Sequence, residues 1–257
     1  MRAAFLIALS TLCFSLGGCA KDRSLAPPPD SEQITVTVKV PKDLSARTLQ
    51  VMYRSTLCTF TDHTASGVAY QRDGYQRTDI QPVRKGQSDL YEAKLSKNGG
   101  GACQWQLSNV TFGVTYGDPT RFGENVTWGT GGGVVVVFDH NNSSRGRTGI
   151  KVDGDLAIRK DYYPWLGEVF LGGYRKYVSL AGEGSLYLGY QALQARRVYF
   201  EPVLHSGFVV GSQGTKVHKI GSFITFTYPD GSVVSDGRSA PDFRKLQAIR
   251  LAAEGKK

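Results

Sequence analysis

The chain has 257 residues, of which 40% are hydrophobic and 21% charged, and its formal net charge is +9 at pH 7. This composition excludes an intrinsically disordered chain, and the length is enough to bury a substantial core, as one large β domain or two small ones. The basic residues are scattered rather than gathered in a stripe, so we expect no nucleic-acid partner. The positive charge favours an anionic membrane surface or an acidic protein partner, or serves solubility alone.

The first predicted element is a signal peptide at residues 1–18. Residues 3–16 are apolar apart from two serines and a threonine, and this stretch is shorter than the ~20 residues of a spanning helix. The run Leu16-Gly17-Gly18-Cys19 resembles the lipobox of bacterial lipoproteins, whose mature chains begin at the cysteine. The resemblance implies lipid on Cys19 as a permanent anchor and, because Ala20 follows instead of Asp, a place in the outer membrane facing the periplasm. The alternatives are an ordinary cleaved signal and a chance match to the lipobox.

Residues 19–33 are predicted to form a flexible tether behind the lipidated cysteine. The run Pro27-Pro28-Pro29 suits neither a helix nor a sheet ladder and prefers an extended polyproline conformation. At ~3.1 Å per residue, the segment would hold a folded domain about 40 Å from the membrane.

Folded structure is predicted to begin with a β domain over residues 34–128. Ile34–Val40 alternates apolar and polar residues with the period of two that is typical of a half-buried strand. Further strands are expected at Leu49–Arg54, Leu90–Leu95, Cys103–Leu107 and Val110–Tyr116. Strands separated by such turn-rich sequence indicate a mainly β fold, an antiparallel sandwich-like domain.

Two cysteines of this region are predicted to form a disulfide. Of the four cysteines in the chain, Cys13 leaves with the predicted signal peptide and Cys19 carries the lipid. Cys58 and Cys103 are then an even pair in an oxidising compartment. A Cys58–Cys103 bridge would contribute about 4 kcal/mol on the chain-entropy estimate. Two reduced thiols are the alternative.

Residues 129–257 are predicted to form a second β-rich half, or to continue the first domain. A fully apolar strand is expected at Val134–Phe138, after a glycine-rich turn. Residues 162–190 interleave aromatic residues with glycines, and Tyr and Trp are favoured at interfaces. One interpretation is a partner-binding surface; the other is that these side chains pack a second β layer. The candidate partner-binding residues are Tyr162, Tyr163, Trp165, Tyr174 and Tyr177.

The end of the chain is predicted to return to strands and close with a short helix. Strands are expected at Arg197–Phe200 and Ile220–Tyr228, and Pro229-Asp230-Gly231 has the composition of a tight turn into a hairpin. Ser239 or Asp242 is placed to cap a helix in which Phe243, Leu246, Ile249 and Ala253 share one stripe. This stripe either packs on the chain's own domain or lies on a membrane or partner.

The sequence shows few signs of catalysis. It contains no Gly-x-Ser-x-Gly, no His-Glu-x-x-His and no Walker loop, and its four histidines stand apart. Asp153-Gly154-Asp155 has too few oxygen ligands for a calcium loop. We therefore expect a protein that is not an enzyme, with no catalytic residue, metal or cofactor.

One further resemblance bears on function. Met52-Tyr53-Arg54-Ser55 followed by Cys58, and then Cys103-Gln104-Trp105, is similar to periplasmic immunity lipoproteins encoded beside type VI secretion phospholipase effectors, over residues 34–116. The resemblance implies a protein partner, a lipase toxin whose access to phospholipid is blocked by direct binding. Two alternatives are a structural or assembly lipoprotein of the outer membrane, and an envelope hydrolase whose site forms only in three dimensions.

Overall fold

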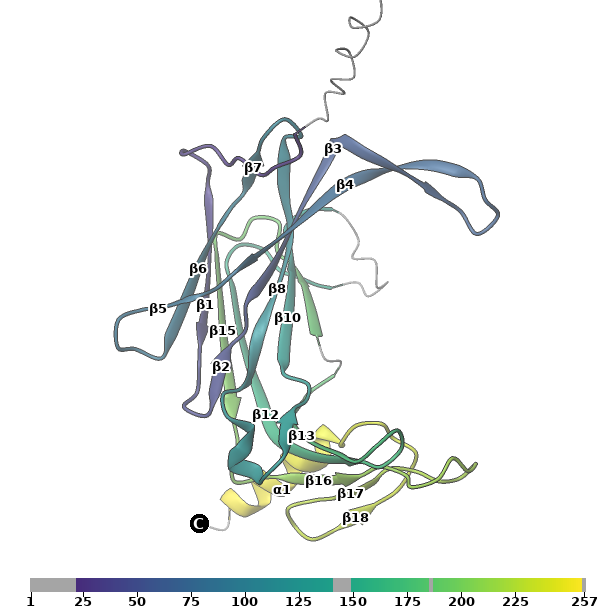
Figure 1. Ribbon diagram of the computed structural model, residues 1–257. Helices are drawn as coiled ribbons and strands as arrows, with labels where there is room; N and C mark the ends of the chain where they lie inside the picture. Colours follow the sequence, from purple (N-terminus) through teal and green to yellow (C-terminus); the bar gives the residue numbers. More distant parts are fainter. Residues whose placement is uncertain (1–21, 141–148, 185–186, 256–257) are drawn as a thin grey trace, which may run out of the picture.

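The structure, a computed structural model, describes residues 22–140, 149–184 and 187–255, so the predicted signal peptide and Cys19 lie outside the described residues. It consists of two large β-sheets that pack face to face, with one α-helix at the C-terminal end (Figure 1). The prediction of a mainly β, sandwich-like fold with a short C-terminal helix is confirmed. In the described part, no helix is both long and apolar enough to cross a bilayer.

The larger sheet has the order β18-β17-β16-β12-β15-β1-β6-β5, with β13 paired to β12 and β9 paired to β13. Its strands are β1 (Gln33–Lys39), β5 (Val83–Arg84), β6 (Leu90–Ser96), β9 (Val126–Trp128), β12 (Leu156–Val169), β13 (Arg175–Gly182), β15 (Arg197–Leu204), β16 (Val210–Gln213), β17 (Thr225–Thr227) and β18 (Val233–Val234).

The smaller sheet has the order β11-β14-β10-β8-β3-β4, with β2 and β7 also paired to β8. Its strands are β2 (Leu44–Ala46), β3 (Leu49–His63), β4 (Ala69–Ile80), β7 (Asn98–Gly100), β8 (Trp105–Tyr116), β10 (Gly132–Val137), β11 (Ile150–Lys151) and β14 (Tyr187–Gln191). A short 3-10 helix, η1 (Pro119–Phe122), follows β8.

Both sheets are mixed, whereas the sequence led us to expect antiparallel pairing. Strand β1 runs antiparallel to β6 but parallel to β15, and β10 runs antiparallel to β8 but parallel to β14. Two of these pairs, β1–β15 and β10–β8, join a strand from the predicted first half to one from residues 129–257. Both halves therefore build both sheets, which corresponds to the one continuous domain that the sequence left open.

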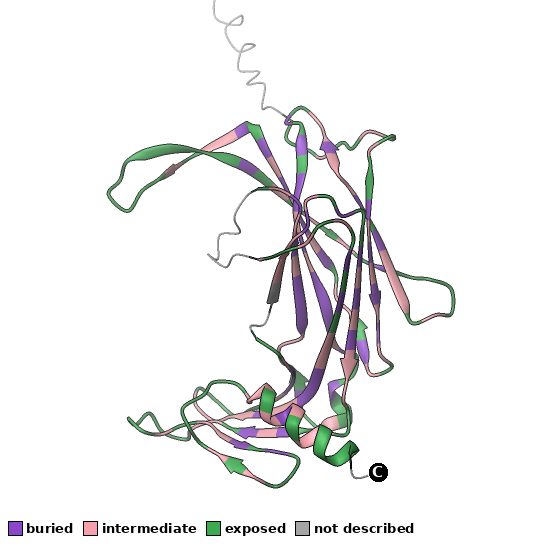
Figure 2. Ribbon diagram, turned by 180° about the vertical axis from the view of Figure 1, so that it is seen from behind, coloured by how far each residue is buried: buried purple, intermediate pink, exposed green. Residues whose placement is uncertain are grey.

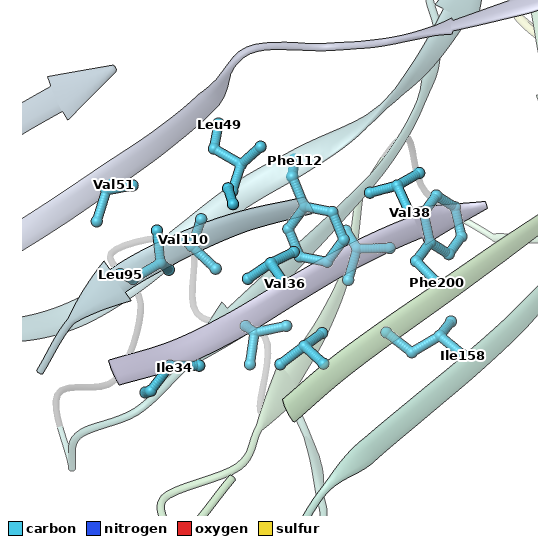
Figure 3. Close-up of a cluster of buried hydrophobic side chains, with 14 of the residues drawn as sticks. Ile34, Val36, Val38, Leu49, Val51, Leu95, Val110, Phe112, Ile158 and Phe200 are labelled. Carbon is cyan, nitrogen blue, oxygen red and sulfur yellow. The ribbon is translucent and has the colours of Figure 1, made fainter. Parts of the chain in front are cut away.

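The main core lies between the sheets. Ile34, Val36 and Val38 of β1 are buried as the alternation predicts, and they face Leu49 of β3 and other residues of the smaller sheet (Figure 3). Phe112 of β8 meets Phe200 of β15 edge-on, with 6.0 Å between the ring centroids. Burying a side chain of this size contributes about 1.5–3 kcal/mol relative to exposure, so this interface holds the two sheets together.

A second, smaller core lies at the end of the molecule where α1 (Phe243–Glu254) packs (Figures 1 and 2). Leu246 of the helix is buried against β-strand residues, and Phe243 and Ile249 pack at its side, whereas Ala253 is exposed. The Asp242 side chain accepts hydrogen bonds from the backbone N–H groups of Arg244 and Lys245, so Asp242 is the N-cap. The helix covers its own domain.

The predicted flexible tether is wrong for residues 22–33. The indole Nε1 of buried Trp105 donates to the carbonyl of Arg23 at 3.0 Å, and the amide of Ala26 donates to the carbonyl of Gly99 at 2.9 Å. Leu25 packs against the main core. The extended conformation that the prolines favour lets this segment lie along the β7 end of the domain, where its backbone groups find partners.

The β3–β4 hairpin extends beyond the sandwich as a curved two-stranded ribbon (Figure 1). We call its outer part, from Leu57 to Tyr75, the arm. Two strands alone are marginally stable in water. The predicted Cys58–Cys103 disulfide is confirmed, with a Cα–Cα distance of 5.4 Å, and it fixes the root of the arm to the loop before β8.

Other contacts at the root reinforce this attachment. The Ser55 hydroxyl donates to the carbonyl of Cys103 at 2.5 Å and accepts from the amides of Leu57 and Cys58, across a register shift in the ladder. A Cβ on Gly74 would lie 1.8 Å from the carbonyl oxygen of Cys58, so the two strands need glycine to approach here. The arm therefore has a fixed root.

Candidate functional site

The candidate functional site is a surface pocket of about 290 Å³ where β9, β12 and β13 meet. Strand β13 pairs antiparallel with β12 and parallel with β9, so three strands contribute side chains to one hollow. Its lining residues are Thr127, Trp128, Gly129, Thr130, Trp165, Val169, Arg175, Tyr177 and Ser179. We call it the aromatic pocket.

Two aromatic rings that the sequence singled out lie side by side in this pocket. Trp165 of β12 and Tyr177 of β13 make an edge-on contact, with 5.9 Å between ring centroids. The Trp165 indole donates to the hydroxyl of Ser212 at 2.7 Å, and burial raises the pKa of the Tyr177 phenol. The Tyr177 ring lies over its cross-strand neighbour Gly167, where a Cβ would come within 2.3 Å of the ring. Glycine at this position lets the ring lie flat on the sheet.

The neighbouring wall is backbone held in a fixed position. The buried Ser179 hydroxyl accepts a hydrogen bond from the amide of Thr130 at 2.8 Å, and the amide of Gly129 donates to the carbonyl of Val178 at 2.8 Å. A Cβ on Gly129 would lie 2.1 Å from the Ser179 oxygen. The first residues of the glycine-rich segment, which we predicted to be a turn, therefore extend the pairing between β9 and β13.

Trp128 is the functional candidate that the sequence reasoning missed. Its side chain is 60% exposed, yet its indole Nε1 donates to the carbonyl of Tyr116 at 2.8 Å. Exposed tryptophan is unusual for a soluble surface, and this one keeps a fixed orientation because of its hydrogen bond. The signal in the sequence was a lone tryptophan directly before a glycine run, outside the aromatic segment on which we concentrated.

The rim of the pocket is charged and polar. Arg175 lines the pocket together with Trp165 and Tyr177 and is exposed. The preceding residue, Tyr174, is 60% exposed. The Tyr174 hydroxyl donates to Glu168 at 2.8 Å, and this hydrogen bond is the first cause of a raised pKa for Tyr174. The pocket therefore has a guanidinium beside its aromatic rings, and an oriented phenol on the adjoining residue.

The prediction of a partner-binding role is wrong for two of the five residues, Tyr162 and Tyr163. Tyr162 and Tyr163 are buried, because adjacent strand residues point to opposite faces and both faces of β12 are covered here. Tyr162 belongs to the main core and Tyr163 to the smaller core. Trp165 and Tyr177 line the pocket, whereas Tyr174 is not one of its lining residues and directly precedes Arg175, which is.

The Tyr163 hydroxyl takes part in packing the helix. It accepts a hydrogen bond from Arg250 of α1 at 3.1 Å, and its ring stacks on His205 with 5.0 Å between centroids. His205 in turn pairs with Asp161 at 2.8 Å. This group connects α1 to the end of β12, which is a structural role.

A second pocket, of about 390 Å³, lies at the root of the arm and contains the residue types of a hydrolase triad, Ser55, Asp73 and His140. The Ser55 hydroxyl is already engaged, since it donates to the carbonyl of Cys103 and accepts two backbone amides. A nucleophilic serine must instead donate to a base. Ser55 therefore holds the arm root.

Two acidic residues outside the pockets, Asp155 and Asp62, also have structural partners. Asp155, of the Asp-Gly-Asp turn, accepts hydrogen bonds from the amides of Arg196 and Arg197 and from the Arg197 guanidinium. Asp62 of the arm pairs with Arg72 at 2.8 Å. Across residues 22–140, 149–184 and 187–255, no cluster of His, Cys, Asp or Glu side chains is arranged to hold a metal ion.

Comparison of the chain with protein-family models, with curated proteins and with solved structures finds no match.

Proposed function

We propose that this protein is a lipid-anchored binding protein of the bacterial envelope, attached through Cys19 to the outer membrane, and that it neutralises a lipase-type toxin of a type VI secretion system by direct binding. The aromatic pocket takes an anchor side chain of the toxin. The protein acts by occupancy and performs no reaction of its own.

The observation that carries this proposal is the composition and rigidity of the pocket. Trp, Tyr and Arg are the residue types most enriched among binding hot spots. Here Trp128, Trp165, Tyr177 and Arg175 surround one hollow. The Trp128 and Trp165 indoles are each held by a hydrogen bond, so little side-chain entropy is lost when a partner docks.

The chemistry of the pocket defines what it accepts. An aromatic or long aliphatic side chain can pack against the rings of Trp128, Trp165 and Tyr177 that line the pocket. A carboxylate on a neighbouring residue of the partner would reach Arg175, and guanidinium–carboxylate pairs are strong and directional. The partner is therefore expected to insert an apolar residue next to an acidic one.

The decisive experiment uses the lipase encoded beside this protein's gene. The purified lipase is assayed on phospholipid vesicles with increasing amounts of the soluble chain that lacks residues 1–19. We expect stoichiometric inhibition, and the variant Trp128→Ala should bind about 30-fold more weakly, which corresponds to a hot spot of about 2 kcal/mol.

Val233→Ala is the matched control, because Val233 is also exposed, at 62%, and lies outside the pocket. It should bind as the unmodified chain does. Absence of a lipase gene beside this one, or full lipase activity with the protein in excess, contradicts the proposal. Hydrolysis of vesicles by the protein alone would favour the hydrolase alternative, and an envelope weakened by gene deletion without any attacker would favour the structural one.

A further inference from the structure

The N-terminal segment is fixed to one end of the molecule from Asp22 onward. Arg23 accepts the Trp105 indole hydrogen bond, and Ala26 pairs with Gly100. The fit is close: a Cβ on Gly100 would lie 2.1 Å from the carbonyl oxygen of Ala26, and one on Gly101 would lie 2.4 Å from that of Ser24. This end of the domain therefore cannot move away from residue 22 without breaking contacts with a buried tryptophan.

Only three residue steps separate Asp22 from Cys19. A fully extended chain spans at most about 3.6 Å per residue, so Asp22 lies within about 11 Å of the cysteine that would carry the lipid. The headgroup layer on each side of a bilayer is itself about 5–8 Å thick. A domain attached by so short a link stands directly against the membrane, and not at the distance of about 40 Å that a polyproline tether would give.

Two exposed side chains of the arm, Leu57 and Tyr75, adjoin residues at the arm root, and the disulfide connects that root to this attachment point. The sulfur of Cys103 lies 4.0 Å from the carbonyl oxygen of Asp22, and its disulfide partner is Cys58. Next to Cys58, Leu57 is 53% exposed, and Tyr75 at the same root is 60% exposed. The disulfide therefore connects the N-terminal segment to the root of the arm, where Leu57 and Tyr75 are exposed.

We propose that this end of the molecule rests on the bilayer that holds Cys19, with Leu57 and Tyr75 in the headgroup region and the arm lying along the membrane surface. The inference rests on the lipidation of Cys19 proposed above. Tyr is suited to this position because its ring is apolar and its hydroxyl can stay hydrated, and exposed Arg23 meets anionic headgroups.

This placement also orients the candidate site. In Figures 1 and 2 the root of the arm lies at one end of the sandwich, while α1 and strands β16–β18 lie at the other. The aromatic pocket is built on β9, β12 and β13, next to α1 and away from the arm root. It would open toward the periplasm, where an arriving partner can reach it.

The test places one tryptophan reporter at each end of the full, lipidated protein. The variants Leu57→Trp and Tyr75→Trp report on the arm root. The control is Ile220→Trp, because Ile220 is fully exposed and lies in the connection between β16 and β17. Each is reconstituted into vesicles of phosphatidylethanolamine and phosphatidylglycerol, three parts to one, with and without bromine-labelled lipid that quenches nearby tryptophan.

We expect the bromine-labelled lipid to quench the added fluorescence of Leu57→Trp and Tyr75→Trp, with a blue shift of their emission, and to leave that of Ile220→Trp unchanged. Inserting twelve Gly and Ser residues between Ala20 and Lys21 should abolish the quenching. The three native tryptophans give a common background in the three substituted variants, and the unsubstituted protein with and without the insertion gives the background for the insertion.

Equal quenching at the arm root and at position 220, in protein whose Cys19 lipid is verified by mass spectrometry, would overturn the placement and leave the toxin-binding proposal intact. Absence of lipid on Cys19 would overturn the placement together with the anchor. Toxin binding by the soluble chain is measured separately, so failure of one proposal is distinguished from failure of the other.

Discussion

Removal of the Cys58–Cys103 disulfide is expected to destabilise the protein and to release the arm. Alanine is the appropriate replacement at both positions, because both cysteines are buried and a serine hydroxyl would need a new hydrogen-bond partner there. The double variant Cys58→Ala/Cys103→Ala removes the bridge and changes little else in the core.

The magnitude follows from the length of chain that the bridge closes. The two cysteines are 45 residues apart, and closing a loop of that length removes conformational entropy from the unfolded chain equivalent to about 4 kcal/mol. Domains are typically stable by only 5–15 kcal/mol, so the loss is a large fraction of the total. In the folded state the effect concentrates at the arm, whose outer strands have no third strand beside them.

Urea unfolding of the soluble chain, followed by tryptophan fluorescence, measures the free energy of unfolding, and limited trypsin digestion measures cleavage after Arg72 in the arm. Reduction of the unmodified protein should reproduce both changes, and reduction of the double variant should add nothing. A loss below about 1 kcal/mol with unchanged cleavage would refute the reasoning, since it would mean that the unfolded chain is already restricted and that the arm holds without its root.

Three further predictions concern single residues. Gly167→Ala should lower the free energy of unfolding in urea by about 1–3 kcal/mol, because its Cβ displaces the Tyr177 ring. Toxin binding should weaken as well, and unchanged binding would mean that the Tyr177 ring is not part of the binding site. Asp242→Ala should cost about 1 kcal/mol through loss of the α1 N-cap, and an unchanged melting temperature would mean that tertiary packing alone sets the helix. The Arg197 guanidinium, followed by two backbone amides, holds the pKa of Asp155 below its ordinary value of 3.8. The ionised Asp155 therefore stabilises the folded protein fully above about pH 4, and this stabilisation is lost as pH falls through the lowered pKa. Between pH 5 and pH 2.5, the melting temperature of Asp155→Asn should fall less than that of the unmodified protein. Equal falls would contradict the assignment.

Strand β4 is one of several strands that the sequence analysis did not predict, and it shows the limit of local sequence patterns. Strand β4 is polar on both faces, so its residues carry no apolar alternation. It forms because β3 offers backbone partners on both sides of the register shift, and because Gly74 allows the strands to approach closely beside Cys58. Strand β12 shows the same limit. The local sequence around Tyr162 and Tyr163 is typical of an interface, but Tyr162 is buried in the main core and Tyr163 in the smaller core.

By itself, the sequence determined the features that depend on neighbouring residues. Alternation in β1 identified its buried face, the composition indicated a mainly β fold, Asp242 marked the start of the helix, and the cysteine count predicted the disulfide. Tertiary structure alone decided strand direction, the packing of residues 22–33 on the domain, and the meeting of Trp128 with Trp165 and Tyr177. These depend on contacts between segments far apart in the chain, and the side chains of one segment hold no record of which other segment will cover them.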